Sequence, residues 1–144
     1  MDNKDIAGWE NPGPDVIEEI FSRATTIAVV GLSSNPDRPS YEVAAYLQAQ
    51  GYKIIPVNPG EKEILGEKSY PDLTSIGHPV DVVDVFRRGE TTPSIVEEAI
   101  KIGAKYIWLQ QGVVSEESYR LARRAGKVIV MDRCMLREHR QLGV

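Results

Sequence analysis

The sequence has a single cysteine among its 144 residues, so no disulfide can form within the chain. No apolar run approaches the roughly 18 residues that a membrane-spanning helix needs. The N-terminal stretch MDNKDIAGWE also lacks the apolar centre of a signal peptide. These absences predict a cytoplasmic protein with no membrane partner.

Basic charge is also scarce and scattered. The formal net charge is −4, and lysine and arginine form no block, which argues against a nucleic-acid partner or a membrane surface. His78 and His139 are the only histidines, and we expect both in peripheral regions. His78, beside Pro79, suits a loop and has no cysteine, histidine or carboxylate at metal-binding spacing, so we expect no metal. Asp81 and Asp84 stand three apart in a predicted strand, so they face opposite sides and do not form a catalytic pair.

The chain is organised around an apolar strand that runs into a polar loop and then a helix. Thr26–Val30 is a β-branched run of the kind found in parallel strands that are covered on both faces. Gly31 ends this strand, and Ser40 is predicted to N-cap a helix whose Val43 and Leu47 face the sheet. The loop therefore opens onto the N–H groups of a helix N-terminus, which favour anions.

The same alternation of strands and helices continues along the chain. Further strands are predicted in KIIPVNPG (53–60), with its end marked by Pro59 and Gly60, and at 81–86, 106–109 and 128–132. Helices begin at Pro14, after Thr92 and after Ser115, and residues 61–77 are less regular. This order predicts an α/β fold, a Rossmann-like doubly wound, mainly parallel five-stranded sheet with helices on both faces. We expect one domain over residues 1–144, with residues 1–24 as an N-terminal extension and helix.

The carboxyl ends of parallel strands meet at one edge of a sheet, where ligands bind. The first loop matches the dinucleotide fingerprint G-x-G-x-x-G only at Gly31. Asn58 stands where NAD-binding folds usually carry a carboxylate for the ribose hydroxyls. A neutral side chain there suits a ligand with an extra phosphate near its ribose, and Arg38 supplies a cation within reach.

Four stretches together resemble the small stand-alone coenzyme A-binding proteins: VVGLSSNPDRPSYEVAAYLQAQGYKIIPVNP, DVVDVFRR, WLQQGV and VMDRCM. These proteins are similar in turn to the N-terminal domain of the succinate–CoA ligase alpha subunit. The resemblance runs from Thr25 to about Leu136. It implies a coenzyme A site in a Rossmann-like domain, with the pyrophosphate on the first loop, the adenosine along the second strand end and the third and fourth strand ends further along the crevice. The implied site residues, in that order, are Gly31, Leu32, Ser33, Ser34, Arg38, Pro39 and Ser40; Val57, Asn58 and Pro59; Phe86 and Arg87; and Gln110, Gln111 and Gly112.

The resemblance implies a non-catalytic protein that binds coenzyme A or acyl-CoA, as a monomer or small homo-oligomer. The ligase carries its phosphorylated histidine in a second domain, and we expect this chain to lack that domain. Two enzymatic alternatives remain open: a nicotinamide-nucleotide-dependent oxidoreductase, and a CoA-ligase subunit that needs a partner chain.

Each candidate residue also has a structural alternative. Ser33 and Ser34 suit a turn, and Arg38 suits a solvated surface. Asn58 before a proline is common where a strand ends. The remaining alternatives are a core position for Phe86, ion pairs of Arg87 and Arg88 with Glu90, and either a buried apolar role or a reactive thiol for Cys134.

Overall fold

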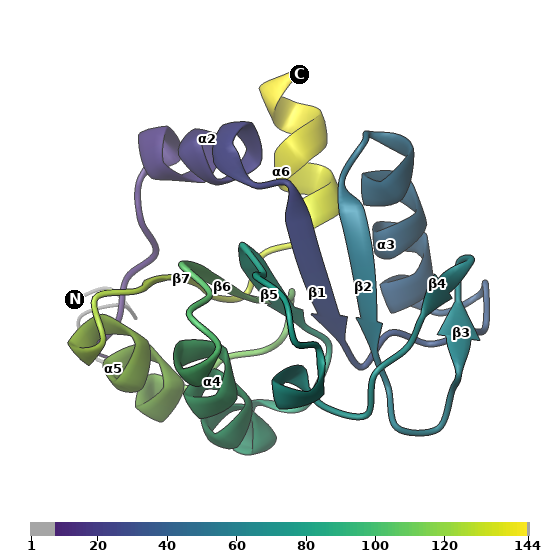
Figure 1. The fold of residues 1–144 in the computed structure, drawn as a ribbon. Helices are drawn as coiled ribbons and strands as arrows, with labels where there is room; N and C mark the ends of the chain where they lie inside the picture. Colours follow the sequence, from purple (N-terminus) through teal and green to yellow (C-terminus); the bar gives the residue numbers. More distant parts are fainter. Residues whose placement is uncertain (1–7, 144) are drawn as a thin grey trace.

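A five-stranded sheet organises the computed structural model, which describes residues 8–143 (Figure 1). All neighbouring strands are parallel, and their order is β2-β1-β5-β6-β7. This confirms the predicted fold class. The strands are β1 (Thr26–Val30), β2 (Lys53–Val57), β5 (Val82–Val85), β6 (Tyr106–Leu109) and β7 (Val128–Val130).

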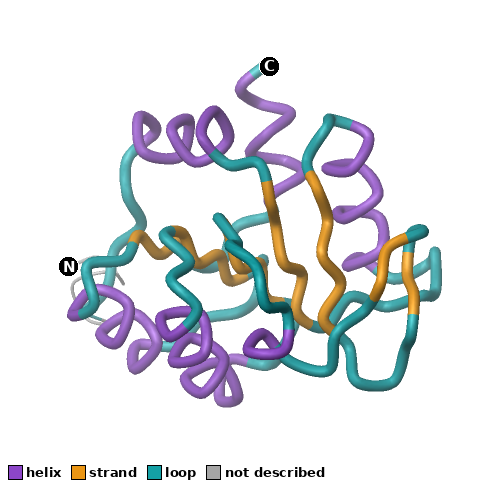
Figure 2. The backbone as a smooth tube through the Cα atoms, viewed as in Figure 1, coloured by secondary structure: helices purple, strands orange, loops and turns teal. Residues whose placement is uncertain are grey.

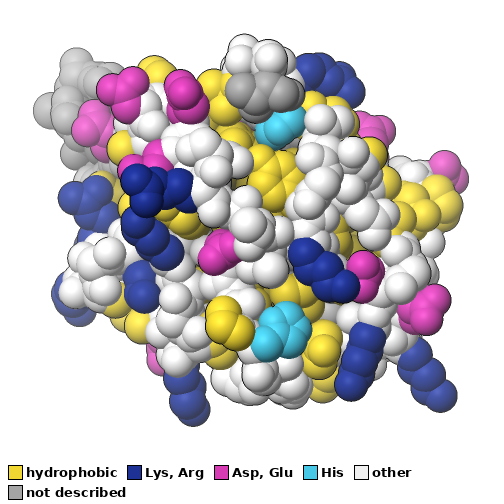
Figure 3. Space-filling model, turned by 45° about the horizontal axis from the view of Figure 1, so that its top comes forward, with side chains coloured by type: hydrophobic (Ala, Val, Ile, Leu, Met, Phe, Trp, Pro, Cys, Tyr) yellow, Lys and Arg dark blue, Asp and Glu magenta, His cyan; other side chains and the backbone are white. Residues whose placement is uncertain are grey.

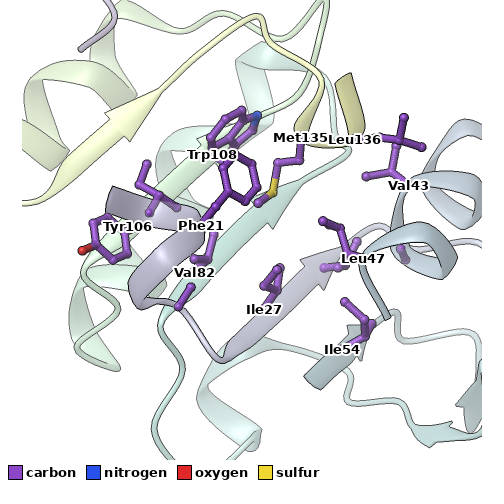
Figure 4. Packing of buried hydrophobic residues seen from close by; sticks show 14 of the residues in the cluster. Phe21, Ile27, Val43, Leu47, Ile54, Val82, Tyr106, Trp108, Met135 and Leu136 are labelled. Atoms are coloured by element: carbon purple, nitrogen blue, oxygen red, sulfur yellow. The ribbon is translucent and has the colours of Figure 1, made fainter. Parts of the chain in front are cut away.

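Helices cover both faces of the sheet because the buried strands are apolar on both sides (Figures 1 and 2). Ile27 and Val29 of β1 pack on one side with the first group of helices, and Ala28 and Val30 pack on the other side. Figure 4 shows the first layer, in which Phe21 lies against Trp108 and Met135. The first group is α2 (Pro14–Arg23), α3 (Pro39–Ala49) and α6 (Met135–Leu142), and the second is α4 (Thr92–Lys101) and α5 (Glu116–Arg124).

The less regular stretch after β2 folds into small elements that cover the sheet edge. Tyr70 pairs with Val57 and extends the outer side of β2. The elements are the hairpin of β3 (Glu63–Ile64) and β4 (Glu67–Lys68) and the 3₁₀ turn η1 (Leu73–Ser75), and a second 3₁₀ turn, η2 (Gly89–Thr91), precedes α4.

The opposite edge, at β7, meets the N-terminal segment, where the Asn11 carboxamide donates to Met131 O and accepts from Met131 N, both at 2.8 Å. The first seven residues of the predicted extension lie outside the described part.

Three expectations from the sequence were wrong. The first is that a helix begins after Thr92, since α4 begins at Thr92 itself with Thr91 as its N-cap. Helix α3 begins at Pro39 with Arg38 as its N-cap, so Ser40 is not the cap; its Oγ instead accepts a hydrogen bond from the Ser33 N–H at 3.0 Å. His139 is not peripheral. It lies in α6, a helix that the sequence did not predict, and is only 3% exposed, with its Nδ1 2.8 Å from Tyr46 Oη. Burial lowers the pKa of His139, so the ring serves as a neutral core group.

No helix within residues 8–143 is long and apolar enough to cross a membrane. On the face that Figure 3 shows, lysine and arginine side chains are dispersed among acidic and uncharged ones rather than gathered into one patch. The dispersion agrees with the even charge pattern of the sequence.

Asp84 is the one acidic residue of the five-stranded sheet. It is fully buried in β5, between Val29 of β1 and Trp108 of β6. Burial raises the pKa of its carboxyl from 3.8 to about 7, although a hydrogen bond from Gln110 opposes the rise. Three residues earlier, burial also disfavours the Asp81 carboxylate, but N–H groups of Thr25 and Thr26 outweigh it and lower the Asp81 pKa.

Gly31 allows the first loop to pass directly over the end of β5. Its φ is +86°, and a Cβ there would overlap the carbonyl oxygen of Phe86. Gly51 has φ +103°, but its Cβ would meet nothing within 4 Å. The two glycines therefore separate the effect of backbone conformation from that of close backbone contact.

We predict that Gly31→Ala lowers the free energy of unfolding more than Gly51→Ala. Alanine at positive φ costs about 1–2 kcal/mol at either site, and the overlap with Phe86 adds about 1–3 kcal/mol at Gly31 alone. Urea unfolding of the two variants and the parent measures this. Equal losses in both variants would show that the Phe86 contact imposes no constraint.

We also predict that Asp84→Asn becomes progressively more stable than the parent between about pH 4 and 7. In that range the folded parent retains a proton on Asp84 that the unfolded chain has lost, so the parent loses stability as pH rises. Above about pH 7 the difference should be constant. Asp81→Asn is the matched control. Its lowered pKa stabilises the folded parent above the unfolded value, so its deficit should vanish on acidification below about pH 4. A pH-independent Asp84→Asn difference would contradict the assignment.

Candidate functional site

The largest cavity, of about 760 Å³, lies at the carboxyl edge of the sheet. Its walls come from the start of α3 and from the ends of β5, β6 and β7. Most of the contributing side chains are apolar or uncharged, apart from two arginines. The lining residues are Pro39, Val43, Phe86, Arg87, Arg88, Thr91, Gln110, Gln111, Gly112, Val113 and Cys134.

A second cavity, of about 370 Å³, adjoins the first and is more polar. The two cavities share Pro39, Phe86 and Arg87, so they form one crevice along the strand ends. The second is lined by Gly31, Ser33, Arg38, Pro39, Ser40, Asn58, Phe86 and Arg87.

A third, smaller cavity of about 180 Å³ lies beside the end of β2, against α4. Val57 and Pro59 line it, as do the carboxylate residues Asp72 and Glu98. Arg87 lines all three cavities. The exposed Arg87 side chain is therefore the one feature that the three spaces share.

The first loop uses its own polar groups to hold its shape. The Gly31 N–H donates to Val57 O at 2.9 Å, and the Asn35 N–H donates to Ser33 Oγ at 3.0 Å. Arg38 is exposed at the N-terminus of α3 and forms no ion pair within the described residues. The N-terminal end of α3, which is the positive end of the helix dipole, and the Arg38 guanidinium thus border the same small cavity, an arrangement that favours anions.

Asn58 joins the loop after β2 to the first loop. Its Nδ2 donates to Leu32 O at 2.9 Å, and its Oδ1 accepts from the Gly60 N–H at 2.8 Å. Nearby, Ser34 Oγ donates to Glu61 Oε1 at 2.6 Å. The sequence did not indicate this carboxylate, because Glu61 lies in an irregular loop that only the fold brings to Ser34.

Most of the predicted site residues meet in the three cavities. Leu32 and Ser34 are the exceptions. Leu32 is fully buried and contributes its carbonyl to Asn58, and Ser34 is exposed beyond the cavity walls. The sequence missed the wall residues Val43, Thr91 and Val113. Val43 did carry a signal as a residue facing the sheet, but its place at the mouth of a cavity depends on how α3 packs.

The walls of the two joined cavities contain no histidine and no carboxylate within residues 8–143. Cys134 is half-buried in the wall of the largest. The same part of the chain contains no cluster of three histidine, cysteine or acidic residues that could hold a metal ion. The arrangement offers the positive end of a helix, hydroxyls and arginines for an anion, beside an apolar space.

The loops after β6 and β7 are locked together at the far end of the crevice. Asp132 Oδ1 accepts from the Gly112 N–H at 2.7 Å, and the Asp132 N–H donates to Val113 O at 3.2 Å. Asp132 has φ +59°, a conformation that L residues rarely adopt and that these two bonds support. Trp108 Nε1 also donates to Arg133 O at 2.8 Å, and this bond holds the backbone directly before Cys134.

Comparison with known proteins identifies relatives of two kinds. YneT of Bacillus subtilis, an uncharacterised protein, is 45% identical over 130 residues, which cover 90% of this chain and 96% of that protein. An ADP-forming acetate–CoA ligase of Archaeoglobus fulgidus is 28% identical over 106 residues, 72% of this chain but only 16% of the ligase.

The fold agrees with the same relationship. A solved protein of Pyrococcus horikoshii is 41% identical and superposes with a TM-score of 0.89, covering 92% of this chain and 94% of that one. Residues 25–140 match the family described as CoA binding domain. This span contains all five strands and every residue of the crevice described above. The chain therefore belongs to the CoA-binding domain family.

Proposed function

We propose that this protein binds coenzyme A or an acyl-CoA in the joined cavities and does not by itself catalyse a reaction. The observation that carries the proposal is the division of the crevice into a polar part and an apolar part. Coenzyme A has the same division, with a phosphate-rich nucleotide at one end and a long, largely uncharged pantetheine arm at the other.

The polar part suits the diphosphate. Arg38, the start of α3 and the hydroxyl of Ser40 border it, and Arg87 stands at its junction with the larger cavity. In a chain of net charge −4, such local cations are needed to attract a ligand with several phosphates. The family membership supports the same ligand class.

The walls also support a binding role without catalysis. Acid–base chemistry needs a titratable group within hydrogen-bond reach of the reacting atoms, and the two joined cavities have neither histidine nor carboxylate in their described walls. The second candidate function is a subunit of a CoA ligase. The match to the ADP-forming ligase favours it, but the chain corresponds to 16% of that protein.

We predict that Arg38→Ala weakens coenzyme A binding by about ten- to a hundredfold, because a hydrogen bond to a charged group contributes about 1.5–3 kcal/mol. Calorimetry at low ionic strength, where phosphate contacts are strongest, measures it. Arg124→Ala, at an exposed arginine of α5 away from the crevice, is the control and should bind as the parent does. Unchanged affinity in Arg38→Ala would move the phosphate site toward Arg87.

We further predict that coenzyme A binds at least about tenfold more tightly than NAD. Asn58 replaces the carboxylate that would bind the ribose hydroxyls of NAD, and its amide is engaged by Leu32 and Gly60. Competition assays with both ligands test this, and dephospho-coenzyme A, which lacks the 3′-phosphate, should fall between them. Equal or tighter NAD binding would favour the oxidoreductase alternative.

A further inference from the structure

One charged group next to the crevice has no role in the proposed phosphate site. Asp84 is completely buried, and its Oδ2 has no hydrogen-bond partner, the only such buried side-chain atom among residues 8–143. Its Oδ1 accepts a hydrogen bond from Gln110 Nε2 at 2.5 Å. A buried carboxyl with one oxygen unpaired costs stability, which an apolar residue at the same place would avoid.

Gln110 connects this carboxyl to the largest cavity. It follows β6 directly, is 4% exposed and forms part of the cavity wall. Its backbone is already committed, since its N–H donates to Val85 O at 3.3 Å and its carbonyl accepts from the Val113 N–H at 2.8 Å. Only the side-chain carboxamide is left to meet a ligand.

The hydrogen bond to Asp84 determines whether the nitrogen or the oxygen of the Gln110 carboxamide is available to the cavity. Asp84 Oδ1 accepts from the Gln110 NH₂ group, and it can do so whether the carboxyl is ionised or carries its proton on Oδ2, so the amide presents its NH₂ group to Asp84. Its oxygen, Oε1, then turns the other way and has no hydrogen-bond partner among residues 8–143. The wall around it is formed by apolar side chains such as Val43, Phe86 and Val113, where a single oriented acceptor is selective.

We propose that Asp84 is a positioning residue that holds Gln110 Oε1 toward the largest cavity as an acceptor for an N–H group of the ligand. This inference rests on the proposed function. The pantetheine arm of coenzyme A carries two secondary amides, and each provides one N–H donor. A site built around an oriented acceptor discriminates against ligands that leave it unpaired.

The test compares coenzyme A with adenosine 3′-phosphate 5′-diphosphate, which has the same nucleotide but no arm. Asp84→Val removes the carboxyl and retains the strand preference of its neighbours Val83 and Val85. We expect it to weaken coenzyme A binding by about three- to tenfold, the value of one neutral hydrogen bond, and to leave binding of the nucleotide within about twofold. Asp84→Asn, which still offers an amide oxygen to Gln110, should restore most of the loss.

Gln110→Leu should produce the same arm-specific loss, and the double variant Asp84→Val with Gln110→Leu should be no worse than Gln110→Leu alone, because both act through one carboxamide. Equal weakening of both ligands by Asp84→Val, additive losses in the double variant, or no loss in either single variant would each overturn the inference. Failure of the parent to bind either ligand would instead refute the proposed function, and the inference with it. Thermal melting of each variant confirms that the folded protein is being compared.

Discussion

The crevice depends on the contact between two stretches of backbone, at Gly31 and Phe86. The first loop crosses the end of β5 so closely that no side chain fits between them, and the Gly31 N–H bonds to Val57 O on the other neighbouring strand. Gly89 repeats the arrangement, since a Cβ there would overlap Val114 O. Because side chains are absent at these two points, the loops after β1, β5 and β6 pack backbone against backbone and bring Phe86 and Arg87 into the centre of the crevice.

Side-chain hydrogen bonds connect the two outer loops, after β2 and β7, to their neighbours in the same way. Asn58 ties the loop after β2 to Leu32, and Asp132 ties the loop after β7 to Gly112. All five strand-end loops are thus connected by contacts within the protein itself. A binding site that is already ordered loses less conformational entropy on association, so more of each contact with Arg38 or Arg87 is available as affinity.

The sequence predicted what depends on local pattern and missed what depends on distant contacts. All five strands of the sheet were predicted from short apolar runs, β-branched at Thr26–Val30. Ser115 was identified as the N-cap of α5, where its side chain accepts from the Ser118 N–H. Helix α6 was not predicted because its sequence is mostly polar, as in the stretch REHRQ, and it buries only a few residues, among them His139. Likewise, nothing local distinguishes Ser40 as a partner of Ser33, or Glu61 as a partner of Ser34. Those pairs exist only once the loops meet.

Asp84 is a polar residue in a strand, β5, whose other residues follow the apolar pattern of a buried parallel strand. The strand VVDV needs apolar residues on both faces, and its other three positions obey that rule. Its neighbours across the sheet, Val29 and Trp108, are also apolar, so packing alone would select valine or isoleucine at this position. A buried carboxyl with an unpaired oxygen is destabilising, so packing does not account for an aspartate at this position. Within the described residues the only side chain that bonds to Asp84 is Gln110, which lines the largest cavity. The buried carboxyl therefore lowers the stability of the sheet and, in return, orients one amide in the wall of the crevice.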